Sequence, residues 1–79
     1  MPMDKKFNAD GLIALRKKRN LTRNKVCREL EYKHGFLTTE GAIRLYEKGN
    51  VERPNLFLIA VLADYYEVKL DYFIQDKVE

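Results

Sequence analysis

The fold is decided by the stretch Thr38-Thr-Glu-Gly-Ala-Ile-Arg-Leu-Tyr-Glu-Lys-Gly49, which Asn-Val-Glu-Arg-Pro54 follows. Its apolar side chains recur three residues apart, which is the pattern of a helix with one buried face. Thr39 can cap the start of such a helix, and Gly49 can adopt the left-handed backbone that ends it. We therefore expect a short amphipathic helix between these two residues.

Two more helices are expected upstream of this stretch. Asn8 or Asp10 can cap the first, which ends at Asn20, and Thr22 can cap the second, which Gly35 stops. The inward positions expected of the two helices are Leu12, Leu15, Val26, Cys27 and Leu30, with Arg19 as a further candidate for the inward face of the first.

Downstream, Pro54 fixes the chain before a fourth helix, in which apolar residues recur at steps of three and four. These residues are Leu56, Ile59, Leu62, Ala63 and Tyr66. A short fifth helix, capped by Asp71 and anchored by Phe73, is expected last. No segment has the pattern of a strand. The sequence thus predicts one all-α domain over residues 1–79, with its core in residues 8–75.

Length and composition limit the classes of protein to consider. A chain of 79 residues has room for one modest core and buries only about 60% of the surface that its unfolded state exposes. The single cysteine cannot form an internal disulfide, and no apolar run approaches the roughly 20 residues of a membrane span. The N-terminus lacks the apolar segment of a signal peptide. We expect a cytoplasmic protein.

The net charge of +3 conceals an asymmetry along the chain. Residues 1–53 hold 13 Lys/Arg and 7 Asp/Glu, whereas residues 54–79 hold 2 and 5. The first part can face a polyanion while the second faces away from it. Charge alone is equally compatible with helices whose charged residues only contact solvent.

Taken together, these helices resemble the lambda-repressor and Cro-like helix-turn-helix regulators of phages and bacteria, the xenobiotic-response-element type. The matching residues are Leu15-Arg16, Leu21-Thr22, Ile43-x-x-Tyr46-Glu47-x-Gly49, Arg53-Pro54 and Leu56-x-x-Ile59-x-x-Leu62-Ala63-x-x-Tyr66-x-Val68-x-Leu70-Asp71-x-Phe73. The resemblance implies a five-helix fold whose second and third helices read double-stranded DNA. It also implies a sequence-specific transcriptional regulator, typically a dimeric repressor of a phage, mobile element or small autoregulated operon that binds an inverted-repeat operator.

The resemblance assigns roles to individual residues. Arg16 and Glu47 form a structural pair that joins the first and third helices. The residues expected to contact DNA are Arg23, Thr39, Glu40, Gly41, Arg44, Leu45, Lys48 and Asn55. Arg44 has the geometry for a bidentate contact with guanine, and Arg23 and Lys48 are expected to contact phosphates. Leu45 touches either a thymine methyl or the core, and Asn55 contacts DNA or only caps the fourth helix.

Two features depart from the family pattern. The segment Glu31-Tyr-Lys-His-Gly-Phe-Leu37 adds about six residues between the second and third helices. We expect it to extend the second helix by one turn to Gly35, with Phe36 or Leu37 filling the buried position that follows. Glu40 and Gly41 also occupy places where the family usually has polar, often glutamine, base-reading residues.

Other functions fit the sequence less well. It has no phosphate-binding glycine loop, no nucleophile with a matching His and acid, and no set of metal ligands around His34 or Cys27. We therefore expect neither an enzyme nor a cofactor or small-molecule ligand. The alternative is a helix-turn-helix fold used as a protein-interaction module, such as an antitoxin-like or inhibitor domain.

A homodimer is expected from the apolar residues of the last two helices. More of them are present than an inward face requires, so part of the set should form an exposed patch. The residues of the expected patch are Phe57, Leu58, Val61, Tyr65 and Tyr72.

Overall fold

The computed structural model describes residues 5–51 and 53–76, with four α-helices, one 3-10 turn and a two-stranded antiparallel sheet in those ranges. In chain order the elements are β1 (Lys5–Phe7), α1 (Ala9–Lys18), α2 (Arg23–His34), α3 (Glu40–Lys48), α4 (Leu56–Tyr66), the 3-10 turn η1 (Leu70–Tyr72) and β2 (Ile74–Asp76). The longest helix has 12 residues, and none in the described ranges is long and apolar enough to cross a membrane.

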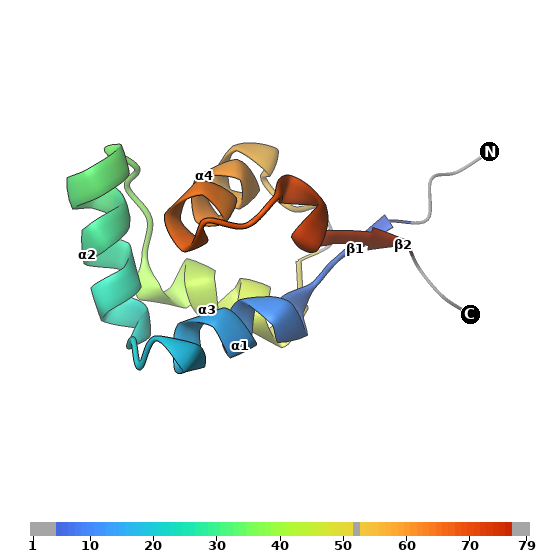
Figure 1. The fold of residues 1–79 in the computed structure, drawn as a ribbon, viewed down its shortest axis with the longest axis horizontal. Helices are drawn as coiled ribbons and strands as arrows, with labels where there is room; N and C mark the ends of the chain where they lie inside the picture. The colour runs from blue at the N-terminus through green and yellow to red at the C-terminus, as the bar shows by residue number, and fades with distance from the viewer. Residues whose placement is uncertain (1–4, 52, 77–79) are drawn as a thin grey trace.

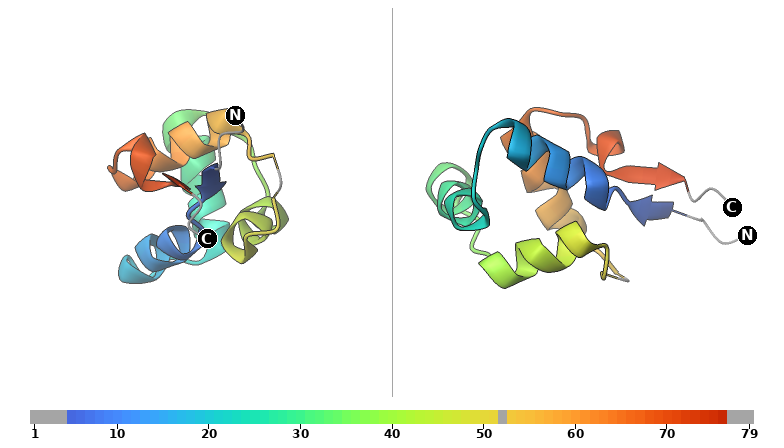
Figure 2. Two further views of the ribbon diagram at one scale, coloured as in Figure 1. Left: turned by 90° about the vertical axis from the view of Figure 1, so that its right-hand side faces the viewer. Right: turned by 90° about the horizontal axis from the view of Figure 1, so that it is seen from below.

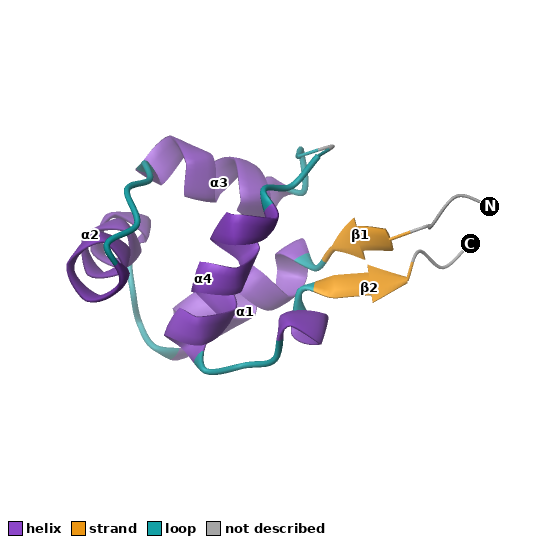
Figure 3. Cartoon of the chain, turned by 90° about the horizontal axis from the view of Figure 1, so that it is seen from above, coloured by secondary structure: helices purple, strands orange, loops and turns teal. Residues whose placement is uncertain are grey.

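The helices surround one core. Helices α1 and α3 lie side by side, α2 runs across one end of them, and α4 packs over the opposite side (Figure 1). Two further views show β1 and β2 together at the end of the molecule remote from α2 (Figure 2). Seen from above, α3 begins next to α2 and continues toward this sheet (Figure 3). This arrangement leaves one long side of α3 uncovered by other helices.

Local capping signals determine where the helices begin and end, as the sequence predicted. Asn8, Thr22, Thr39 and Asn55 each accept a backbone N–H in the first turn of α1, α2, α3 and α4, at donor–acceptor distances of 2.9–3.1 Å for the shortest bond of each. Gly35 and Gly49 end α2 and α3 with φ of 63° and 73°. A side chain at either φ would be strained, which accounts for glycine at both places.

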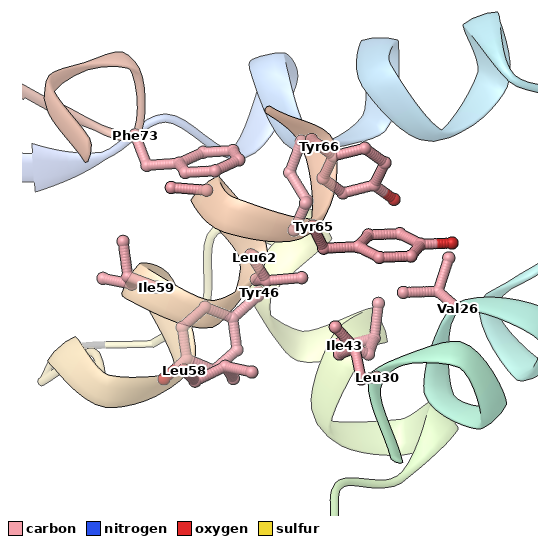
Figure 4. Close-up of a cluster of buried hydrophobic side chains, with 12 residues drawn as sticks. Val26, Leu30, Ile43, Tyr46, Leu58, Ile59, Leu62, Tyr65, Tyr66 and Phe73 are labelled. Carbon is pink, nitrogen blue, oxygen red and sulfur yellow. The ribbon is translucent and has the colours of Figure 1, made fainter. Parts of the chain in front are cut away.

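The core collects apolar side chains from every helix and from the C-terminal segment (Figure 4). Its fully buried members include Leu12, Val26, Leu30, Ile43, Ile59, Leu62 and Phe73. All seven are positions that the sequence predicted to face inward. Leu56, predicted on the same face of α4 as Ile59 and Leu62, is 65% exposed and lies outside the core. Cys27 lies at the edge of the core and is only half-buried.

The expected dimer patch is partly wrong. Leu58 and Tyr65 are buried at 3% and 7% exposure and belong to the core, and Val61 is half-buried against it. Phe57 and Tyr72 keep 69% and 38% of their surface exposed. Helix α4 is covered on more sides than a single inward stripe requires, because α2 packs against it as well as the C-terminal turn.

The predictions of a fifth helix and of no strands were also wrong. Residues Leu70–Tyr72 form a single 3-10 turn preceded by Lys69, and Asp71 lies inside the turn instead of capping it. The chain then pairs with β1 in the register Phe7 with Ile74 and Lys6 with Gln75. Phe73 is nevertheless the inward anchor that the sequence predicted, with no exposed surface.

Gly11 explains how the C-terminal turn sits so close to α1. A Cβ at this position would lie 2.8 Å from the ring of Tyr72 and 2.8 Å from Cγ of Asn8. Asn8 donates its backbone N–H to the carbonyl of Phe73 at 2.8 Å. Its side-chain Nδ2 donates to the carbonyl of Tyr72 at 2.9 Å. A glycine inside α1 therefore allows this helix to contact the turn η1 closely.

Candidate nucleic-acid interface

Five charged side chains from α1, α2 and α3 form a continuous series of ion pairs, which we call the charge ladder: Arg16, Glu47, Arg23, Glu40 and Arg44. The four successive N–O distances are 2.7, 3.1, 3.4 and 2.8 Å. Positive and negative groups alternate along the ladder, and it runs from the buried side of α3 to the exposed side. It therefore connects the internal support of α3 to its outer surface.

The buried end of the ladder is the pair that the sequence predicted. Glu47 is 4% exposed and accepts from Nε and Nη2 of Arg16 at 2.7 and 3.1 Å. Arg16 also donates to the carbonyl of Leu21 at 2.8 Å, and its hydrogen bond to Glu47 raises its pKa. A buried carboxylate is acceptable here because both oxygens are bonded and the partner is permanently charged.

The exposed end of the ladder is formed by Glu40 with two arginines. Glu40 accepts from Arg44 at 2.8 Å and from Arg23 at 3.4 Å, and the bond from Arg44 lowers the pKa of Glu40. Arg23 also donates Nε to Glu47 at 3.1 Å. Arg23, expected as a simple phosphate contact, is thus engaged with two carboxylates. The structure adds this internal role to the one expected from the sequence.

The outer face of α3 carries Arg44, Leu45 and Lys48, all exposed. Leu45 has 51% of its surface exposed, so the alternative that it packs into the core is wrong. Lys48 makes no ion pair with any residue in the described ranges. This face therefore presents a lysine, an arginine and an apolar side chain to solvent within a little more than one helical turn.

Gly41 lies at the start of the same face, and protein packing does not require it. The nearest atom to a Cβ built there is Oγ1 of Thr39 at 4.0 Å. Thr39 itself is used as the cap of α3, accepting from the N–H of Ala42 at 3.1 Å. Because Gly41 has no side chain, the backbone in the first turn of α3 is accessible to close approach by a ligand.

Asn55 lies where the chain enters α4, and its side chain acts as the helix cap. Its Oδ1 accepts from the N–H groups of Phe57 and Leu58 at 2.9 and 3.4 Å, while its own N–H donates to the hydroxyl of Tyr46 at 2.7 Å. Of the two roles expected for Asn55, the structure shows the cap.

The inserted segment, residues 31–37, extends α2 by one turn to Gly35, as the sequence predicted. Helix α2 continues to His34 and ends at Gly35. Phe36 fills the half-buried position, with its ring edge-to-face on Phe57 at 5.6 Å, whereas Leu37 is 75% exposed. Leu37 in the segment before α3 and Phe57 in the first turn of α4 are therefore both exposed apolar residues.

Sequence reasoning missed the structural role of Arg19. It donates to the carbonyls of Tyr65 and Tyr66 at 3.4 and 3.0 Å, and its guanidinium lies 5.3 Å from the Tyr66 ring centroid. Arg19 thus caps the C-terminal end of α4, where the helix dipole favours a cation. Partial burial of Cys27 raises the pKa of its thiol, which favours the unreactive protonated form.

Comparisons of the chain with protein-family models, with curated proteins and with solved structures gave no match. Any functional conclusion therefore depends on the arrangement of α2 and α3 and on the charges they present.

Proposed function

We propose that the protein is a sequence-specific DNA-binding transcriptional regulator in which α2 and α3 form a lambda-repressor-like helix-turn-helix unit. One observation carries the proposal: α3 is fixed by a buried inner face of Ile43, Tyr46 and Glu47 while its outer face is uncovered and carries Arg44 and Lys48. A helix that is held on its inner face and carries cationic side chains on its exposed outer side is the geometry that reads a DNA groove.

The dimensions of α3 suit the major groove of duplex DNA. An α-helix with its side chains is about 10–12 Å across, and the groove is about 12 Å wide and accepts one α-helix. In this pose the start of α2 comes near one backbone, so Arg23 and Thr22 lie near phosphates. Arg44 faces the base edges and Lys48 a phosphate at the other end of α3. Phosphate contacts hold the helix in register, and contacts with base edges supply sequence preference.

Replacing Arg44 and Lys48 one at a time distinguishes contacts with base edges from contacts with phosphates. Arg44→Ala should relax preference at one base pair and cost about 1–3 kcal/mol on the preferred site, with little loss on random DNA. Lys48→Ala should weaken all sequences alike and reduce the slope of log affinity against log salt by about one. Fluorescence anisotropy with both duplexes at several salt concentrations measures the two effects. Equal losses on both duplexes for Arg44→Ala would make Arg44 a phosphate contact.

Gly41→Ala tests whether DNA approaches the first turn of α3. Alanine meets open space here and favours helix, so the variant should be more stable by up to about 1 kcal/mol. If a base or phosphate packs against the bare backbone, the added methyl should weaken DNA binding by roughly tenfold, as overpacking by about 1–3 kcal/mol does. Thermal melting and anisotropy should therefore move in opposite directions. A variant that is more stable and binds equally well would place DNA away from this turn.

The protein is further proposed to bind an inverted repeat as a homodimer and to repress a phage, mobile element or small autoregulated operon. Of the expected patch, Phe57 and Tyr72 keep exposed surface that is available to a second copy, whereas Leu58 and Tyr65 are buried. Half-sites should lie about one duplex turn apart, roughly 34 Å. The operator sequence shows both whether the site is an inverted repeat and how far apart its half-sites lie.

Selection of bound oligonucleotides from a random pool tests the function. The proposal predicts an enriched palindrome with half-site centres about 10 base pairs apart. Enrichment of no sequence, together with no salt-dependent binding to generic duplex DNA, would contradict it.

A second candidate is a protein-interaction module built on the same fold. It is favoured by the ion pairs that Arg23 and Arg44 make with Glu40 and by the exposed Phe57 and Leu37. A salt titration distinguishes the two functions. Binding through phosphates falls steeply with salt, whereas a protein-docking surface shows little affinity for DNA at any salt concentration.

A further inference from the structure

Glu40 lies between the two arginines that the DNA-facing surface would use. Its two carboxylate oxygens are divided between them: Oε1 accepts from Arg44 at 2.8 Å and Oε2 from Arg23 at 3.4 Å. The three side chains are partly open to solvent, with 28% exposure for Glu40, 48% for Arg44 and 34% for Arg23. A ligand that reaches α3 can therefore compete for each of these bonds.

The ion pairs of Glu40 lower the affinity of this surface for any DNA. Each arginine must leave a carboxylate before it can turn fully to a phosphate, and the carboxylate that remains then faces a polyanion. Arg23 would keep its bond to Glu47, but Arg44 has no other acceptor in the described ranges. Non-specific binding is made mainly through phosphates, which are acceptors only, so this mode of binding offers Glu40 no replacement donor.

A cytosine in the major groove changes this balance. Its 4-amino group is a donor, and a carboxylate is the side chain that accepts from it. A cytosine opposite Glu40 would replace the hydrogen bond that Arg44 gives up. Arg44 could then turn to a guanine edge, for which its paired N–H groups are suited.

We propose that Glu40 is a specificity-determining residue, which holds Arg23 and Arg44 away from random DNA and releases Arg44 when a cytosine amino group takes its place. This inference depends on the proposed DNA-binding function. It assigns to Glu40 the recognition of a C·G base pair in each half-site, and it makes weak non-specific binding a property of the wild-type protein.

Glu40→Gln tests the proposal with little change in shape. Glutamine keeps the size of the side chain, removes its charge and weakens its hold on both arginines. Glu31→Gln is the matched control, because Glu31 is exposed on α2 and makes no ion pair among the described residues, so its loss changes the net charge equally. Both proteins are titrated by anisotropy against the selected duplex and a random duplex, over a range of salt.

The expected result is a loss of discrimination in Glu40→Gln alone. Random DNA should bind about tenfold more tightly, with a salt slope steeper by about one unit for the extra phosphate contact. The ratio of selected to random affinity should fall by about tenfold or more, while the control keeps the wild-type ratio. If Glu40→Gln and Glu31→Gln behave alike, Glu40 is not the discriminating residue, although DNA binding itself stands.

A change in the DNA provides a second test that does not depend on how a variant folds. Each cytosine of the selected duplex is replaced in turn by a pyrimidin-2-one nucleoside, which lacks the 4-amino group. Wild-type protein should lose about tenfold in affinity at one position of each half-site, the size of effect expected for one specific base contact. Sensitivity at no position would overturn the inference. Absence of wild-type binding to any duplex would instead overturn the proposed function, and this inference with it.

Discussion

Arg16→Ala is expected to lower the free energy of unfolding by about 3–5 kcal/mol, the effect of removing one partner from a buried ion pair. Glu47 is 4% exposed and takes two hydrogen bonds from Arg16. Without them it keeps only the bond from Arg23, whose side chain is one-third exposed and cannot replace a bidentate guanidinium. The pair joins α1 to α3, so its loss should loosen the support of the outer face of α3.

Two controls make this expectation specific to the pair. Arg28→Ala removes a cation from an exposed position of α2 that makes no ion pair in the described ranges, and should stay within about 0.5 kcal/mol of wild type. The double variant Arg16→Met with Glu47→Leu should recover much of the loss, because it buries no unpaired charge. Urea unfolding followed by circular dichroism gives all the values. An Arg16→Ala protein with the same midpoint as Arg28→Ala would show that the pair does not hold α3.

Phe73→Ala is expected to cost about 3–5 kcal/mol, as a large-to-small change in a core does. The Phe73 ring has no exposed surface and stacks on Phe7 at 5.5 Å, with Tyr72 edge-on at 5.4 Å. A cavity here removes the packing that holds β1, β2 and η1 to the helices. Amide hydrogen exchange should therefore accelerate first in Phe7 and Ile74, which pair across the sheet.

Phe57→Ala is the matched control for Phe73→Ala. It removes the same side chain from a position that is 69% exposed, so its cost should be well below that of Phe73→Ala. Domains are typically stable by only about 5–15 kcal/mol, which means that Phe73→Ala should lose a large part of its stability and melt well below the wild type. Equal denaturation midpoints for the two variants would contradict the core position of Phe73.

The four helices could be predicted because the signals for their ends are local. Thr22, Thr39, Gly35 and Gly49 act on backbone groups within a few residues of themselves, so their effect does not depend on the rest of the fold. The sheet could not be predicted in this way. Each strand has three residues, too few to show alternation, and β1 pairs with a segment at the other end of the chain.

The candidate site was predictable to a similar degree. The Arg16–Glu47 pair followed from a resemblance, and the spacing of Glu40 and Arg44 allowed an i,i+4 pair. The bonds from Arg23 to both carboxylates depend on how α2 crosses α3, and the inserted segment left that geometry undetermined by the sequence. The buried positions of Leu58 and Tyr65 likewise depend on packing against two elements instead of one.

We propose that the outer face of α3 binds double-stranded DNA. Titration of isotope-labelled protein with the selected duplex, followed by amide chemical shifts, shows whether it does. We predict saturable shifts in the start of α2, at Thr22 and Arg23, and along α3 from Thr39 to Lys48, which diminish as salt is added. The absence of shifts in α3, or shifts confined to α4 around Phe57, would contradict the claim.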